Sequence, residues 1–106
     1  MRILVTESLK NYKGISVKQT NLLGEELKDD LTYRDVFATA LNGYARDEQP
    51  VAEVKAKAFQ LSTKLYEKKE VDLTLDERAL IKERVNKIYA SPLICGRVAE
   101  LLEEKK

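Results

Sequence analysis

The chain of 106 residues carries 19 basic and 18 acidic side chains, no histidine and one cysteine. This length predicts a single domain, residues 1–106, that buries enough surface to fold without a metal or a disulfide. The net charge of +1 gives no overall attraction to phosphate or to an anionic membrane, and one cysteine excludes an intramolecular disulfide.

The N-terminal segment, residues 1–19, has the pattern of a β-hairpin with a longer loop. Ile3 and Val5 alternate with their neighbours, as do Ile15 and Val17, and the intervening stretch LKNYKG supplies an Asn and a Gly for a turn. Two isolated strands are marginally stable in water, so the hairpin is expected to pack on helices. The apolar run at its start is too short for a signal peptide or a membrane span, which favours a cytosolic protein.

The next stretch, TNLLGEELKDD at residues 20–30, is expected to be a loop. Gly24 and the paired acids Asp29 and Asp30 interrupt any periodic pattern. We expect its apolar side chains to lie beneath the domain: Leu22, Leu23 and Leu27.

Start and stop signals divide the rest of the chain into helices. The expected helices cover residues 32–44, 51–68, 75–89 and 92–104. Two of them begin with a capping box, in which a Thr is followed three residues later by an acid: Thr32 with Asp35, and Thr74 with Glu77. The other two begin at a proline, and we expect the first helical positions to be Pro50 and Pro92.

Each expected helix has an apolar face at helical spacing. The longest stripe lies on residues 51–68 and is made of Val54, Ala58, Leu61 and Leu65. Phe59 and Tyr66 are expected to broaden it. The four faces predict one shared core, so the expected fold is mainly α (α+β), an N-terminal β-hairpin packed on a compact bundle of about four helices.

The residue types exclude several kinds of chemistry. Without histidine there is no Ser–His or Cys–His pair, and one cysteine does not supply a zinc site. The glycines form no phosphate-binding loop. Cys95 lies among apolar residues and is interpreted as a small core residue. We therefore expect no enzymatic activity and no catalytic, cofactor-binding or metal-binding residues.

The last two helices raise the possibility of a helix-turn-helix. A recognition helix needs polar, base-reading side chains and clustered basic groups on its outer face. The final helix instead begins with an apolar run, and Arg97 is its lone basic residue before Lys105. The helix at 75–89 interleaves basic and acidic residues, which indicates a packed element with a mixed-charge outer face.

Three segments resemble small uncharacterised proteins encoded by tailed bacteriophages and prophages. They are LTYRDVFATAL at Leu31–Leu41, EVDLT at Glu70–Thr74, and the pattern Tyr-x-x-Pro-Leu at Tyr89–Leu93. The resemblance brings no activity and no catalytic residues. It implies a phage setting, with action inside an infected bacterium or within a virion.

These observations favour a small protein-interaction module that binds and modulates a larger phage or host protein. Exposed aromatic residues often anchor partners, so we expect contacts at the hairpin loop, Asn11, Tyr12 and Lys13. We also expect contacts at basic residues predicted to be exposed: Arg78, Lys82 and Arg84. Two alternatives stay open, a helix-turn-helix-like nucleic-acid-binding regulator and a virion structural or assembly protein. A homo-oligomer is compatible with the pattern, and no cofactor or membrane partner is expected.

Overall fold

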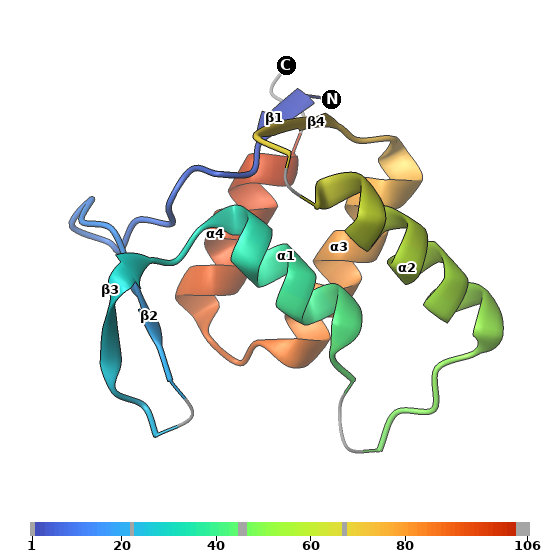
Figure 1. Ribbon diagram of the computed structural model, residues 1–106, viewed down its shortest axis with the longest axis horizontal. Helices are drawn as coiled ribbons and strands as arrows, with labels where there is room; N and C mark the ends of the chain where they lie inside the picture. Colours follow the sequence, from blue (N-terminus) through green and yellow to red (C-terminus); the bar gives the residue numbers. More distant parts are fainter. Residues whose placement is uncertain (1, 22, 45–46, 67, 104–106) are drawn as a thin grey trace.

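The computed structural model of the protein describes residues 2–21, 23–44, 47–66 and 68–103. Within them the helices are α1 (Tyr33–Asn42), α2 (Ala52–Leu65), α3 (Leu75–Ile88) and α4 (Pro92–Leu102). The strands are β1 (Arg2–Leu4), β2 (Lys18–Thr20), β3 (Glu26–Asp30) and β4 (Glu70–Asp72). A hairpin near the N-terminus accompanies the helices, and the expected fold class is confirmed (Figure 1).

The pairing of the first strand differs from the expected one. β1 pairs antiparallel with β4, which places Ile3 opposite Val71, and not with residues 15–17. Both of these side chains are buried. A short strand with one apolar side chain pointing inward fits any partner that presents another, and its alternation does not specify which partner that is.

The hairpin itself forms between β2, at the end of the segment expected to be the hairpin, and β3, within the segment expected to be a loop. That expectation was wrong because the polar residues at its centre close a tight turn. The Asn21 side chain accepts hydrogen bonds from the amides of Leu23 and Glu25, and Gly24 adopts a left-handed φ of +82°. Glycine reaches this backbone conformation without the steric cost that a side chain adds.

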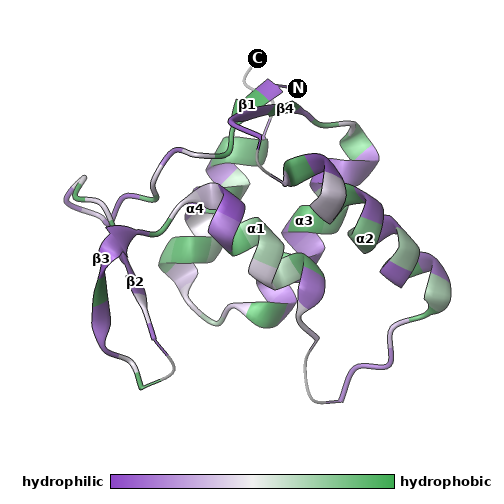
Figure 2. Cartoon of the chain, viewed as in Figure 1, coloured by the Kyte–Doolittle hydropathy of each residue, from purple (hydrophilic) through white to green (hydrophobic). Residues whose placement is uncertain are grey.

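Leu23 and Leu27 of this hairpin do not pack beneath the domain. Leu23 is 83% exposed and Leu27 is also exposed, while Leu22 lies outside the described residues. The hairpin is largely hydrophilic and stands to one side of the helices (Figure 2). The expected burial of Leu23 and Leu27 was therefore wrong.

Three of the four helices begin where the sequence predicts. Both capping boxes form, with the Thr32 and Thr74 hydroxyls accepting hydrogen bonds from the amides of Asp35 and Glu77. Pro92 occupies the first turn of α4, and the preceding Ser91 hydroxyl accepts a hydrogen bond from the Ile94 amide. The exception is α2, which starts at Ala52 after an extended Val51, so Pro50 precedes the helix and is not its first residue.

The helices pack around α1, which contacts both α2 and α3, while α4 packs against α3 (Figure 1). The core draws apolar side chains from all four helices, from β1 and β4 and from the segment after β1. Its members include Ile3, Val5, Leu9, Val36, Phe37, Ala40, Leu41, Ala58, Leu61, Leu65, Val71, Leu73, Ile81, Val85, Val98 and Leu102. The predicted apolar faces thus meet in one core.

The expected broadening of the α2 stripe was wrong. Phe59 is 72% exposed and Tyr66 is similarly exposed, although both are aromatic. At 100° per residue, Phe59 is turned far from the buried face that Ala58 and Leu65 share. Among the described elements, α1 is the one that packs closely on this helix, so a narrow stripe is enough to hold it.

Candidate functional site

A turn at residues 10–16 projects from the N-terminal segment, where the loop of the hairpin was expected. An antiparallel bridge between Lys10 and Ser16 closes it. The Asn11 amide donates to the Ile15 carbonyl at 2.8 Å, and the Asn11 side-chain oxygen accepts from the amides of Lys13 and Ile15 at 2.8 and 3.1 Å. Gly14 adopts a left-handed φ of +82°. The backbone of this segment, called the Tyr12 loop below, is therefore held by its own hydrogen bonds.

Arg97 of α4 fixes the Tyr12 loop to the helices. Its Nε donates to the Lys10 carbonyl at 2.9 Å and its Nη2 donates to the Asn11 carbonyl at 2.8 Å. Nη1 of the same side chain reaches the Glu100 carboxylate at 3.2 Å. The planar guanidinium thus holds two successive carbonyls and one acid in a fixed geometry, which a lysine ammonium does not reproduce.

The Tyr12 loop presents an aromatic side chain to solvent. Tyr12 is 80% exposed, and Lys13 and Ile15 are also exposed. Beside them lies a shallow depression of about 170 Å³ lined by Tyr12, Pro92, Leu93, Gly96, Arg97 and Glu100. Tyrosine combines a large apolar ring with a polar tip and is enriched among residues that dominate binding energy. Of the residues expected to bind a partner, Tyr12 and Lys13 are exposed, and Tyr12 lies beside a shallow depression.

Two of the three basic residues expected on the surface are buried instead. Arg78 is 7% exposed and donates to the Leu102 carbonyl at 3.3 Å. Arg84 is 2% exposed and forms an ion pair with Glu48. The hydrogen bonds that Arg84 donates to the Glu48 carboxylate raise the pKa of Arg84 above its usual value, so this side chain keeps its charge despite burial. The expectation that both are exposed was wrong.

The spacing of Arg78 and Arg84 along α3 is a signal in the sequence for their burial, but their charge led to the opposite prediction. Arg78 and Arg84 each lie three residues from Ile81, on the side of α3 that carries Val85. Since α3 packs between α1 and α4, this side faces the core. Lys82 lies off that face and is half-buried.

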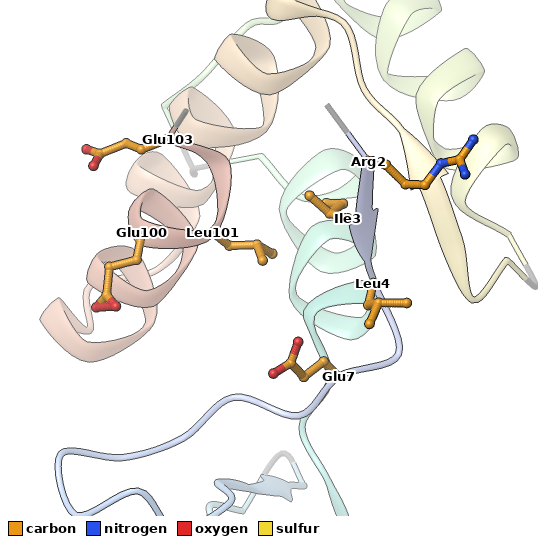
Figure 3. Close-up of a pocket in the computed structure, with 7 residues that line it drawn as sticks. All are labelled: Arg2, Ile3, Leu4, Glu7, Glu100, Leu101 and Glu103. Atoms are coloured by element: carbon orange, nitrogen blue, oxygen red, sulfur yellow. The ribbon is translucent and has the colours of Figure 1, made fainter. Parts of the chain in front are cut away.

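A second depression, of about 410 Å³, lies between β1 and α4 and has an acidic rim (Figure 3). Ile3 and Leu101 face each other across it, while Glu100 and Glu103 project outward from α4. The carboxylates therefore do not converge on a common point. In the described part of the chain, no three His, Cys, Asp or Glu side chains are grouped as a metal ion would require.

The remaining chemical candidate, Cys95, is half-buried on α4. Its thiol donates to the Tyr89 carbonyl at 3.4 Å. It packs against the core, in agreement with its interpretation as a small core residue. None of the helices within the described ranges is long and apolar enough to cross a bilayer.

Comparisons with protein-family models, with curated proteins and with solved structures gave no match to this chain. The resemblance to phage proteins stays a prediction. Function is therefore argued below from the surface of the molecule.

Proposed function

We propose that the protein is a small non-enzymatic interaction module that binds a larger protein through the Tyr12 loop and the adjoining surface of α4. The observation that carries this proposal is an aromatic side chain, 80% exposed, on a backbone fixed by Asn11 and Arg97. Exposure of an aromatic ring to water is unfavourable in the monomer, and burial of that ring against a partner is favourable.

The fixed backbone supports this role energetically. A partner that binds a flexible loop must offset the entropy lost when the loop becomes ordered. In the Tyr12 loop, hydrogen bonds from Arg97 and within the turn have already removed most of that freedom. A tyrosine hot spot of this kind contributes at least about 2 kcal/mol, which is about 30-fold in Kd.

The resemblance to phage proteins supports a phage setting for this module. The partner in this proposal is a phage or host protein that the module modulates, in the bacterial cytoplasm or in a virion. The nucleic-acid alternative is weakened because Arg78, Arg84 and Arg97 all hydrogen-bond within the chain. A phosphate-binding surface needs such side chains to be available.

Affinity capture from a lysate of phage-infected bacteria tests the proposal. The baits are the wild-type chain, Tyr12→Ala and Tyr66→Ala, with folding checked by circular dichroism. Tyr66 is a matched control because it is similarly exposed but directly follows α2, away from the Tyr12 loop in the sequence. We expect the wild type and Tyr66→Ala to recover the same protein, and Tyr12→Ala to recover at least about tenfold less.

Equal recovery by all three baits contradicts the proposed surface. Retention of duplex DNA, with an affinity that falls steeply as salt is raised, would favour the nucleic-acid regulator instead. Self-association of the chain in light scattering, without capture of another protein, would favour the assembly role.

A further inference from the structure

A groove separates α2 from α3 on a face of the molecule distinct from the Tyr12 loop. Both helices pack on α1, and between them lies a depression of about 630 Å³. Its apolar lining comes from Val54 and Leu61 of α2 and from Ala79 and Leu80 of α3. Leu61 is buried, Val54 and Leu80 are half-buried, and Ala79 is exposed. The groove therefore has an apolar floor that the fold leaves partly uncovered.

The two walls of this groove carry opposite charges. Lys57 and Lys64 line it from α2, whereas the lining residues of α3 include the acids Asp76, Glu77 and Glu83. The walls are joined at one end, where Lys64 Nζ lies 2.8 Å from Glu77 Oε1.

Elsewhere along the groove, the wall charges pair within their own helices. Lys57 pairs with Glu53 at 3.2 Å, and Glu83 pairs with Lys87 at 3.5 Å. Both of these pairs are solvent-exposed and so contribute little to stability. They are therefore readily exchanged for pairs with a bound partner.

We propose that the groove between α2 and α3 binds one amphipathic α-helix of a partner protein. Its apolar edge would lie on Val54 and Leu80, with acidic side chains on the flank facing Lys57 and basic side chains on the flank facing Glu83. A helix laid in a groove between two helices is a recurring mode of recognition, read by apolar anchors at i, i+3 or i+4, and i+7.

The dimensions and charges fit this occupant. The α2 wall runs from Val54 to Lys64, which is about 15 Å at 1.5 Å per residue, or about three turns of a bound helix. Opposite charges on the two walls favour one orientation of a helix that has an acidic and a basic flank. A symmetric dimer formed through this groove would place one concave groove against another and leave the apolar floor unfilled.

Binding of a designed peptide to the intact protein tests the proposal. The probe is a fluorescein-labelled 14-residue peptide with leucines along one edge, glutamates on one flank and lysines on the other. One control peptide has serine in place of leucine, and a second has glutamates on both flanks. We expect saturable binding in fluorescence anisotropy for the probe, and at least about tenfold weaker binding for each control.

Variants of the protein locate the binding. Ala79→Tyr places a ring in the groove from an exposed position, so it is expected to preserve the fold and to weaken binding at least about tenfold. Lys57→Glu makes both walls acidic and is expected to weaken binding, whereas Lys55→Glu, an exposed position on α2 outside the groove, is not.

Three results would overturn the proposal. They are no binding of the probe at about 1 mM, binding that Ala79→Tyr leaves unchanged, and a dimer in sedimentation that Ala79→Tyr abolishes. The outcome is independent of the Tyr12 loop, because Tyr12→Ala is expected to bind the probe as the wild type does.

Discussion

Arg84 of α3 and Glu48 of the segment between α1 and α2 form a bidentate ion pair, with N–O distances of 2.6 and 2.9 Å. The same guanidinium donates to the Gly43 carbonyl at 2.9 Å and lies 4.6 Å from the centre of the Tyr44 ring. One side chain of α3 therefore holds the residues that follow α1 and those that precede α2. Its energetic importance is open to direct measurement.

Replacement of Arg84 by Met should lower the free energy of unfolding by about 3 kcal/mol. Removing one partner of a buried ion pair leaves the other without its counter-charge, which costs about 3–5 kcal/mol, and the partial exposure of Glu48 favours the lower end. Urea denaturation measures the change. Lys87→Met is the control, because Lys87 is exposed and its ion pair with Glu48 is longer, at 3.8 Å. This variant should change stability by less than about 0.5 kcal/mol. A similar loss in both variants would show that the buried pair has no special role.

Replacement of Arg97 by Ala should loosen the Tyr12 loop without unfolding the helices. The carbonyls of Lys10 and Asn11 would lose the hydrogen bonds that Arg97 donates, and the Asn11 carbonyl would keep only the one from the Gly14 amide, so the turn would open more often. We expect amide hydrogen exchange at Asn11 and Ile15 to accelerate at least about tenfold, while amides in α3 keep their rates. Arg97→Lys keeps the charge but not the fork of donors, and should give an intermediate rate. Unchanged exchange at Ile15 in Arg97→Ala would mean that the turn is rigid by itself.

Replacement of Thr74 by Ala should destabilise the protein by about 1 kcal/mol. The Thr74 hydroxyl accepts a hydrogen bond from the Glu77 amide at the start of α3, and an alanine leaves that amide without this acceptor. Thr74→Ser retains the acceptor and should be nearly neutral. Thermal unfolding of the two variants, compared at equal pH, separates the cap from the loss of a methyl group.

Glu77 should make the stability of the protein depend on pH in the acid range. Burial acts to raise its pKa, but hydrogen bonds from Lys64 and from Thr74 outweigh burial and hold the pKa below the usual value of 4.5. In the unfolded chain this carboxyl therefore takes up its proton at a higher pH than it does in the native protein. Its contribution to the free energy of unfolding is complete above pH 4.5 and is lost as the pH falls through the native pKa.

The variant Glu77→Gln isolates this contribution. It should reduce stability near pH 7 by about 1 kcal/mol and flatten the stability curve below about pH 4.5 relative to the wild type. Urea unfolding at a series of pH values gives both curves. Parallel curves for the two proteins at low pH would assign the acid sensitivity to other carboxylates.

The sequence by itself was enough to predict the helices and most of their starts. A capping box depends on residues three apart, so Thr32 with Asp35 and Thr74 with Glu77 specify two helix starts without any knowledge of the fold. The apolar periodicity likewise predicted most of the buried face of each helix, because the spacing of side chains along a helix is fixed by its geometry. It did not predict that Phe59 is exposed or that Arg78 and Arg84 are buried.

Only the tertiary structure decided which strand β1 joins, that Arg84 pairs with Glu48, and that Arg97 holds the Tyr12 loop. These contacts join residues far apart in the chain, with 36 positions between Arg84 and Glu48 and 86 between Arg97 and Asn11. Neither periodicity nor spacing encodes such pairs. A guanidinium can be hydrogen-bonded by water at the surface or by an acid or a carbonyl in the protein, and the local sequence does not tell which of these the fold provides. Local sequence patterns thus determined the helices, whereas contacts between segments far apart in the chain determined which side chains lie on the surface of the protein.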